Sequence, residues 1–127
     1  MTTPDLTAPD RRRLVIAWSR ERNAAADAIR RNDPGQAWAH LERAHIVSQP
    51  LAGRHVRTHI AMLRFALRRH EWHEVAGQML RTLLAAPGSW SGRYPVGNTG
   101  GSNVNAFTAM DIPNDLRPLL TTSVTTS

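Results

Sequence analysis

The sequence predicts an all-α protein, and three observations support this. Apolar residues recur at helical spacing between about residues 9 and 86. Helix-starting and helix-breaking residues at 32–34 and 49–50 divide that stretch into segments of helical length. The chain is 41% hydrophobic, enough for a core in a domain of 127 residues. We expect either a four-helix bundle or two tetratricopeptide-like helical hairpins, with a long Gly-rich C-terminal segment covering them.

The first two helices are predicted over residues 9–31 and 34–48. The first carries an apolar stripe, which comprises Leu14, Ala17, Trp18, Ala24, Ala25 and Ala28. Asp33 and Pro34 then supply an N-cap and a proline at the first helical position. The second helix should bury Trp38, Leu41 and Ala44 and end before Gln49-Pro50.

The third and fourth helices are predicted over residues 51–69 and 71–86. The apolar residues expected in the core are Val56, Ile60, Leu63 and Leu67 in the third helix, and Trp72, Val75, Ala76, Met79 and Leu83 in the fourth. Pro87-Gly88 should end the fourth helix. Residues 30–37 and 68–75 are weakly alike at an offset of 38, a repeat length typical of tetratricopeptide hairpins.

The remaining residues are predicted to be irregular. Residues 1–8 read as a flexible arm and 121–127 as a flexible tail, leaving 9–120 as a single domain. Turn-forming residues dominate 88–102, so this segment should lack helix, and 112–120 should form one short helical turn. The long segment 88–107 is either a lid or structural cover, and Gly97-Asn98-Thr99-Gly100-Gly101 favours a tight turn over a phosphate cradle.

The charge pattern limits the classes of partner. All sixteen basic residues are Arg and the net charge is +6, yet these arginines are scattered and aromatic residues are few, so nucleic-acid binding is disfavoured. The sequence contains no run of 18 apolar residues, so no membrane span is expected. The N-terminal residues lack the apolar part of a secretory signal and cysteine is absent, so we expect a cytoplasmic protein. A small-molecule partner and homo-oligomerisation stay open.

Histidine is the residue type that points to chemistry, because all six histidines lie between residues 40 and 73. His55 and His59 are four residues apart and share a face of the third helix. Glu42 and His45 have the Glu-x-x-His spacing of metal sites in helical bundles. In an antiparallel hairpin about residue 50, His45 should lie level with His55, and Glu42 with His59.

A second hairpin, about residue 33, would bring Glu21 level with His45. Because Glu21 falls within an apolar stripe, its carboxylate needs a partner. Glu21, Glu42, His45, His55 and His59 are therefore our candidate ligands for one or two divalent ions, with Zn, Fe or Mn favoured by the nitrogen and oxygen donors. Alternatively, Glu21 pairs with Arg43 or Arg57 and the histidines are structural. His40, His70 and His73 are expected at the surface.

Three segments resemble a family of short bacterial proteins known only as a domain of unknown function. They are Leu41-Glu42-Arg43-Ala44-His45-Ile46 with Gln49, His55-Val56-Arg57-Thr58-His59, and Pro95-Val96-Gly97-Asn98-Thr99-Gly100-Gly101. The similarity covers about residues 12–120. The resemblance implies that the histidine motifs and the glycine-rich segment belong to one unit, and it implies no reaction.

The leading functional hypothesis is a divalent-metal-binding helical protein, with a His/Glu site between the first three helices. Whether it is an enzyme is left undecided, although open coordination positions would permit Lewis-acid chemistry. Two alternatives remain at this point. One is a tetratricopeptide-like interaction module without catalysis, and the other is a bundle that binds haem or another cofactor.

Overall fold

The computed structural model describes residues 8–91, 98–101 and 110–120, and within the first four helices it describes side chains from residue 11 to residue 82. These parts of the chain form helices and connecting turns, which confirms the all-α prediction. The helices are α1 (Ala8–Arg30), α2 (Pro34–Ser48), α3 (Ala52–Arg68), α4 (Trp72–Ser91) and the short α5 (Arg117–Leu120). In the described part of the chain, no helix combines the length and the apolar character needed to cross a bilayer.

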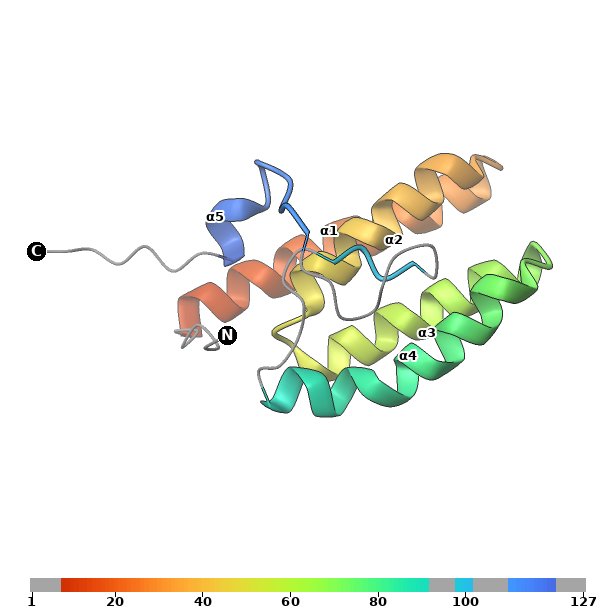
Figure 1. The fold of residues 1–127 in the computed structure, drawn as a ribbon. Helices are drawn as coiled ribbons and strands as arrows, with labels where there is room; N and C mark the ends of the chain where they lie inside the picture. Colours follow the sequence, from red (N-terminus) through yellow and green to blue (C-terminus); the bar gives the residue numbers. More distant parts are fainter. Residues whose placement is uncertain (1–7, 92–97, 102–109, 121–127) are drawn as a thin grey trace, which may run out of the picture.

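The helices form two antiparallel hairpins that lie side by side (Figure 1). In the first hairpin α1 packs along α2, and in the second α3 packs along α4. A smaller contact between α2 and α3 joins the hairpins, and α5 lies against α1. Because α2 and α3 are consecutive helices joined by a short turn, side chains from both can meet between the hairpins.

The turns between paired helices have clear local causes. Asn32, two residues after the end of α1, adopts a positive φ of 55°, a conformation that Asn accepts more readily than most residues. The Asp33 carboxylate accepts a hydrogen bond from the Gln36 backbone N–H at 3.2 Å, and Pro34 begins α2. His70, with a φ of 56°, occupies the corresponding position after α3. The helices α1, α2 and α3 begin and end within one residue of their predicted bounds.

Two hydrophobic clusters form the core. The first contains Ala25, Ala28, Ala37, Leu41, Met62 and Phe65, and the second contains Leu14, Ile46, Val47, Leu51 and Leu116. Along α2, His45 falls between Leu41 of the first cluster and Ile46 of the second. Along the chain from Leu51 to Met62, the buried residues are His55, Thr58 and His59. A polar layer therefore separates the two clusters on both helices.

The end of α4 differs from the prediction. The helix continues through Pro87 and Gly88 to Ser91, so residues 88–91 are helical although we expected none of 88–102 to be. A proline inside a helix removes one backbone hydrogen bond and crowds the preceding turn, but it does not forbid continuation. The predicted arm and tail lie outside the described residues, apart from Ala8, which begins α1. Of the predicted covering segment after α4, only residues 98–101 are described.

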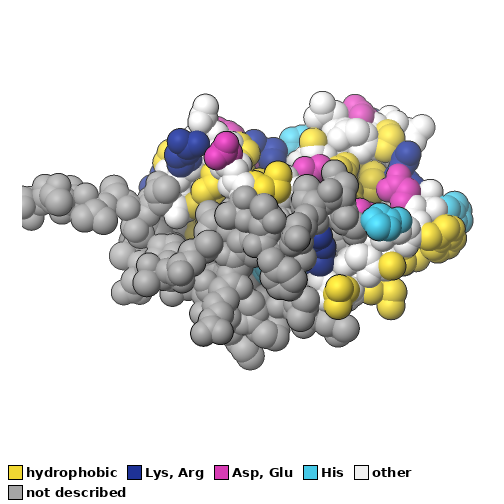
Figure 2. All heavy atoms as spheres, viewed as in Figure 1, with side chains coloured by type: hydrophobic (Ala, Val, Ile, Leu, Met, Phe, Trp, Pro, Cys, Tyr) yellow, Lys and Arg dark blue, Asp and Glu magenta, His cyan; other side chains and the backbone are white. Residues whose placement is uncertain are grey.

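The predicted inward faces of α3 and α4 were wrong in large part. Val56, Ile60, Leu63 and Val75 are only half-buried, and the side chain of Leu83 lies outside the described residues. The buried residues of α3 are His55, Thr58, His59, Met62, Phe65 and Ala66, whereas Leu67 is 43% exposed. On α4, Gln78 is fully buried, whereas Trp72 and Met79 are 62% and 58% exposed. Hydrophobic side chains are accordingly visible at the surface in Figure 2, where Figure 1 places the α3–α4 turn. The polar residues turn inward because they bond one another, as described next.

Candidate metal centre

Three histidines converge in the polar layer between the hairpins. His45 comes from the last turns of α2, and His55 and His59 come from successive turns of α3. All three are buried. Among the described residues, they form a group in which one potential ligand atom from each side chain lies within 4.8 Å of the others. This confirms the predicted juxtaposition of His45 with the His55/His59 pair.

The three imidazoles meet through their Nε2 atoms. The Nε2 of His45 lies 3.0 Å from the Nε2 of His55 and 3.0 Å from that of His59, and the third separation is 3.2 Å. The rings approach edge-on or tilted, with centroids 4.6 to 4.9 Å apart, so they do not stack. The geometry is that of a tripod of nitrogen atoms directed at one point.

Hydrogen bonds on the opposite ring nitrogens fix the protonation of two of these rings. The Nδ1 of His45 lies 2.6 Å from the Asn98 backbone carbonyl, which can only accept, so Nδ1 carries the proton. The Nδ1 of His59 lies 2.6 Å from Oε1 of Gln78 and must also donate. In the neutral rings, each Nε2 then presents a lone pair. The 3.0 Å contact between His45 and His59 therefore joins two acceptors.

Gln78 is held so that its oxygen faces His59. Its Nε2 donates to Oε1 of Glu74 and to the Gly100 backbone carbonyl, both at 2.7 Å. Because both partners are acceptors, the amide nitrogen must face them and the amide oxygen must face His59. The Gly100 N–H in turn donates to Oδ1 of Asn98 at 2.9 Å. The polar network thus connects α2, α3, α4 and residues 98–101.

At Gly100 the backbone passes close to the ring of His45. Its φ is +85°, and a Cβ built there would lie 2.6 to 2.9 Å from three atoms of the His45 ring. No side chain fits at that distance, and the left-handed φ also favours glycine. Gly100 therefore forms a packing surface for His45, and Gly97 of the predicted tight turn lies outside the described residues.

The surroundings keep the imidazoles of His45 and His59 neutral. Burial lowers the pKa of His45 well below its usual value, and the neighbouring His59 and His55 lower it further. Burial also lowers the pKa of His59 to about 4, against a smaller opposing effect of its hydrogen bond to Gln78. The positive charge of Arg81 lowers the pKa of both rings. At neutral pH, these two side chains are therefore uncharged bases, the form that ligates metal ions.

The structure places Glu21 away from the histidine tripod. Its carboxylate contacts Nδ1 of His40 at 2.7 Å and Nε of Arg43 at 2.8 Å. This is the ion pair with Arg43 that the sequence left open as an alternative. Residues 21 and 43 are symmetric about residue 32, whereas the predicted match with His45 required a centre at residue 33. Moving the centre by one residue shifts the partner by two, and therefore to the other side of α2.

Glu42 lies close to the centre without joining the group of three. It is half-buried one turn before His45, and burial together with the nearby Glu74 raises its pKa. Its carboxylate is not among the ligand atoms within 4.8 Å of one another. His40 is partly exposed and bonded to Glu21, and His70 and His73 are at the surface as expected.

The sequence did not reveal the residues that orient the histidines. Gln78 was passed over because it interrupts an apolar pattern on α4, although a buried amide is itself a signal of a polar network. Asn98 acts through its backbone carbonyl and Gly100 through its lack of a side chain. Neither effect has a signature that separates it from an ordinary turn in a single sequence.

Comparison with known proteins gives a family without a function. A family model described as "Protein of unknown function (DUF3703)" matches residues 12–120, and the chain therefore belongs to this family. No curated protein and no solved structure matched the chain.

Proposed function

We propose that this DUF3703 protein binds one divalent metal ion through the Nε2 atoms of His45, His55 and His59. One observation supports the proposal most strongly, the lone pairs of His45 and His59 facing each other at 3.0 Å. A proton on Nε2 of His55 could be donated to only one neighbour at a time, and the contact between His45 and His59 would still lack a donor. A metal ion in place of that proton would satisfy the lone pairs of all three nitrogens together.

The spacing of the three nitrogens suits one ion. Zn–N bonds of about 2.0–2.1 Å in a tetrahedral arrangement separate ligand nitrogens by about 3.3 Å, and right-angled octahedral ligands by about 3.0 Å. The separations here are 3.0 to 3.2 Å. Two ions would need donors further apart. The same spacing argues against haem, whose axial ligands stand on opposite sides of a wide ring.

The donor set favours zinc, with iron and manganese as weaker candidates. Three neutral imidazoles without a thiolate or a carboxylate suit Zn²⁺ and neighbouring first-row ions, whereas Mn²⁺ prefers oxygen donors. Both His45 and His59 donate their outer N–H groups to carbonyl oxygens, an arrangement that orients metal-bound histidines and increases their basicity. These outer hydrogen bonds favour a metal site over an incidental histidine cluster.

Three protein ligands leave a coordination position for water or a small ligand. Zinc centres with three histidines and one open position activate bound water, whereas purely structural zinc centres use four protein ligands. We therefore propose Lewis-acid or water-activating chemistry as the function of the loaded site. Co²⁺ titration followed by visible absorption would report a four-coordinate site as intense bands. Added azide would then change those bands if a position is open to exchange.

Metal analysis of untagged protein tests the proposal directly. We expect one ion per chain in the purified protein, and a single binding event when Zn²⁺ is titrated into chelator-treated protein by calorimetry. His55→Ala and His59→Ala should each lose at least about a hundredfold in affinity, because two ligands remain. His73→Ala, at an exposed position, is the matched control and should bind as the wild type does.

Circular dichroism must show that the alanine variants keep their helical content. If the folded wild-type protein neither contains nor takes up a stoichiometric ion among Zn²⁺, Fe²⁺, Mn²⁺ and Co²⁺, the proposal is wrong. Binding that survives both alanine substitutions would likewise place the ion elsewhere.

A further inference from the structure

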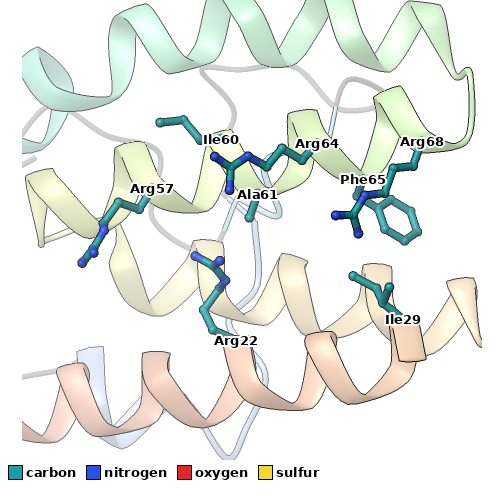
Figure 3. Close-up of a pocket in the computed structure, with 8 residues that line it drawn as sticks. All are labelled: Arg22, Ile29, Arg57, Ile60, Ala61, Arg64, Phe65 and Arg68. Carbon is teal, nitrogen blue, oxygen red and sulfur yellow. The ribbon is translucent and has the colours of Figure 1, made fainter. Parts of the chain in front are cut away.

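A groove between α1 and α3 is lined by four arginines. Its volume is about 470 Å³, within the range of small-ligand pockets. Arg22 comes from α1, and Arg57, Arg64 and Arg68 come from one side of α3. In Figure 3 the guanidinium groups of Arg22 and Arg64 point toward one another from opposite walls. The groove uses a different face of α3 from the one that carries His55 and His59.

None of these four arginines pairs with a carboxylate in the described part of the chain. The ion pairs found there involve Arg30, Arg43, Arg69 and His40 instead. Glu21, the neighbour of Arg22 in sequence, points to α2. Burial lowers the pKa of Arg22, and the positive charges of Arg57 and Arg64 lower it further. The protein thus brings like charges together at a cost that no acidic side chain among these residues offsets.

The positive cluster continues at the end of the groove near Trp18. The guanidinium carbons of Arg22, Arg54 and Arg57 lie 5.3 to 5.8 Å from the centre of the Trp18 ring. Stacking of this kind spreads and orients guanidinium groups without neutralising them. The Nε of Arg54 is buried and has no hydrogen-bond partner among the described groups. The Trp18 ring therefore holds three guanidinium groups near one another at this end of the groove.

The remaining walls of the groove are apolar. They are formed by Ile29, Ile60, Ala61 and Phe65, and Phe65 is only 8% exposed. An inorganic anion would contact the guanidinium groups alone and leave this surface wet. A ligand with an apolar body and an anionic end would use both kinds of wall. Guanidinium groups bind phosphate in a two-pronged geometry, and the double negative charge of a phosphate monoester matches more than one of them.

We propose that the groove between α1 and α3 binds a small organic phosphate, with the phosphate between Arg22 and Arg64 and the apolar body against Ile60, Ala61 and Phe65. The proposal is independent of the metal centre. It names a second ligand site that the histidines neither form nor require.

Phenyl phosphate is a suitable probe because it carries one phosphate and one apolar ring. Calorimetry on the full-length protein, in a buffer free of phosphate, should show binding in the micromolar to low millimolar range with one site per chain. Inorganic phosphate should bind at least about fivefold more weakly, and phenol should not bind measurably. Metal-loaded and chelator-treated protein should bind phenyl phosphate equally, so failure here is distinguishable from failure of the metal site.

Variants locate the site. Arg64→Gln and Arg22→Gln should each weaken phenyl phosphate binding roughly tenfold, the effect of losing one charge-assisted contact. Arg20→Gln removes the same charge from an exposed position on α1 that does not line the groove, and should leave the affinity unchanged within about twofold. Without ligand, Arg64→Gln should melt about 1–2 °C higher than the wild type because one like-charge contact is relieved.

Three results would overturn the proposal. The first is no detectable binding at a phenyl phosphate concentration of about 10 mM, which is on the order of ten times the largest dissociation constant expected here. The second is an equal loss of affinity in Arg20→Gln and Arg64→Gln, which would indicate diffuse attraction to a cationic protein. The third is micromolar, salt-sensitive binding of a single-stranded oligonucleotide that Arg64→Gln abolishes, which would assign the groove to nucleic acid.

Discussion

The histidine centre and the arginine groove lie on different faces of α3, and they differ in whether their polar side chains have bonding partners. In the centre, the Asn98 carbonyl and the Gln78 amide oxygen accept from the outer nitrogens of His45 and His59, and the Gly100 carbonyl accepts from the Gln78 amide nitrogen. The groove leaves its guanidinium groups without carboxylates among the described residues. In the first region hydrogen bonds to the outer ring nitrogens hold neutral bases in place, and in the second region like charges lie close together and repel one another. Our two proposals therefore rest on opposite observations, hydrogen-bonded polar groups in the first region and, among the described residues, unpaired like charges in the second.

Gly100→Ala should have the largest effect and should be confined to the histidine centre. A positive φ costs a non-glycine residue about 1–2 kcal/mol, and displacing a packed ring costs about 1–3 kcal/mol more. We expect the free energy of unfolding to fall by roughly 2–5 kcal/mol in urea denaturation, together with a loss of Zn²⁺ affinity. Phenyl phosphate affinity should not change in protein that remains folded. Wild-type stability in this variant would show that residue 100 does not pack on His45.

The pH dependence of stability should also separate the two regions. The pKa of His59 falls from 6.5 in the unfolded chain to about 4 in the folded protein. The unfolded state therefore binds more protons between these values, so stability is present above pH 6.5 and is lost as the pH falls toward 4. For His59 alone the loss is about 3 kcal/mol.

Urea denaturation of chelator-treated protein at several pH values measures this slope. Arg64→Gln should keep the same slope because guanidinium groups do not titrate in this range. His59→Gln should reduce it, since one titrating group is removed while His45, whose pKa burial also lowers, remains. A wild-type stability that is level between pH 6.5 and 4 would contradict the buried, neutral state of His59.

Gln78→Met tests whether the hydrogen bond from His59 to Gln78 contributes to Zn²⁺ affinity, and its effect should be of intermediate size. Methionine has a similar volume but cannot accept the hydrogen bond from His59 or donate to Glu74 and Gly100. Zn²⁺ affinity should fall about 10- to 100-fold, or about 1.4–2.7 kcal/mol, as measured by calorimetry or competition with a chelator.

The matched control for this substitution is Thr82→Val, one turn further along α4. The Thr82 hydroxyl donates to the Gln78 backbone carbonyl, so its removal leaves the side-chain bonds of Gln78 intact. We expect this variant to bind Zn²⁺ as the wild type does. Equal affinity in Gln78→Met and the wild type would reduce the network to a packing role.

Salt should have the smallest effect, and it should act through the groove. Raising the ionic strength from about 0.01 to 1 M shortens the screening distance from about 30 to 3 Å and weakens the repulsion among Arg22, Arg57 and Arg64. The free energy of unfolding should rise by a few tenths of a kcal/mol in NaCl. Arg64→Gln should gain less than the wild type, and Arg20→Gln should gain as much. A larger gain in Arg64→Gln would show that the groove is not the origin of the repulsion.

The accuracy of the sequence prediction varied with the type of signal. The turn at Asn32-Asp33-Pro34 was placed correctly because capping and positive φ are local effects. The apolar faces of α3 and α4 were misplaced because the buried face carries His55, Thr58 and His59 on α3 and Gln78 on α4. Polar residues at buried positions remove the hydrophobic pattern from the face that is in fact buried. The error in the predicted buried faces therefore lies at the histidine centre, where polar residues occupy buried positions.

The candidate ligands show the same division. His45, His55 and His59 were brought together correctly, because two helices joined by a short turn have few registers available. Glu21 was misplaced since a one-residue change in the turn sends it to His40 and Arg43. Glu42 was expected in the same shell, yet its carboxylate is not in the group of three. Counting residues from the turn predicts which residues lie at the same height along a helix pair. Whether their side chains touch also depends on how each helix is rotated about its axis.

By itself, the sequence determined the first three helices, the turns between paired helices and the clustering of histidine on α2 and α3, because these follow from interactions within a few residues. Only the tertiary structure decided that three Nε2 atoms share one point, that Asn98 and Gln78 hold two of the rings, and that four arginines from α1 and α3 line one groove. Those features need side chains from separate helices within a few ångströms of one another. Such distances depend on how each helix is rotated and packed, which local patterns do not encode.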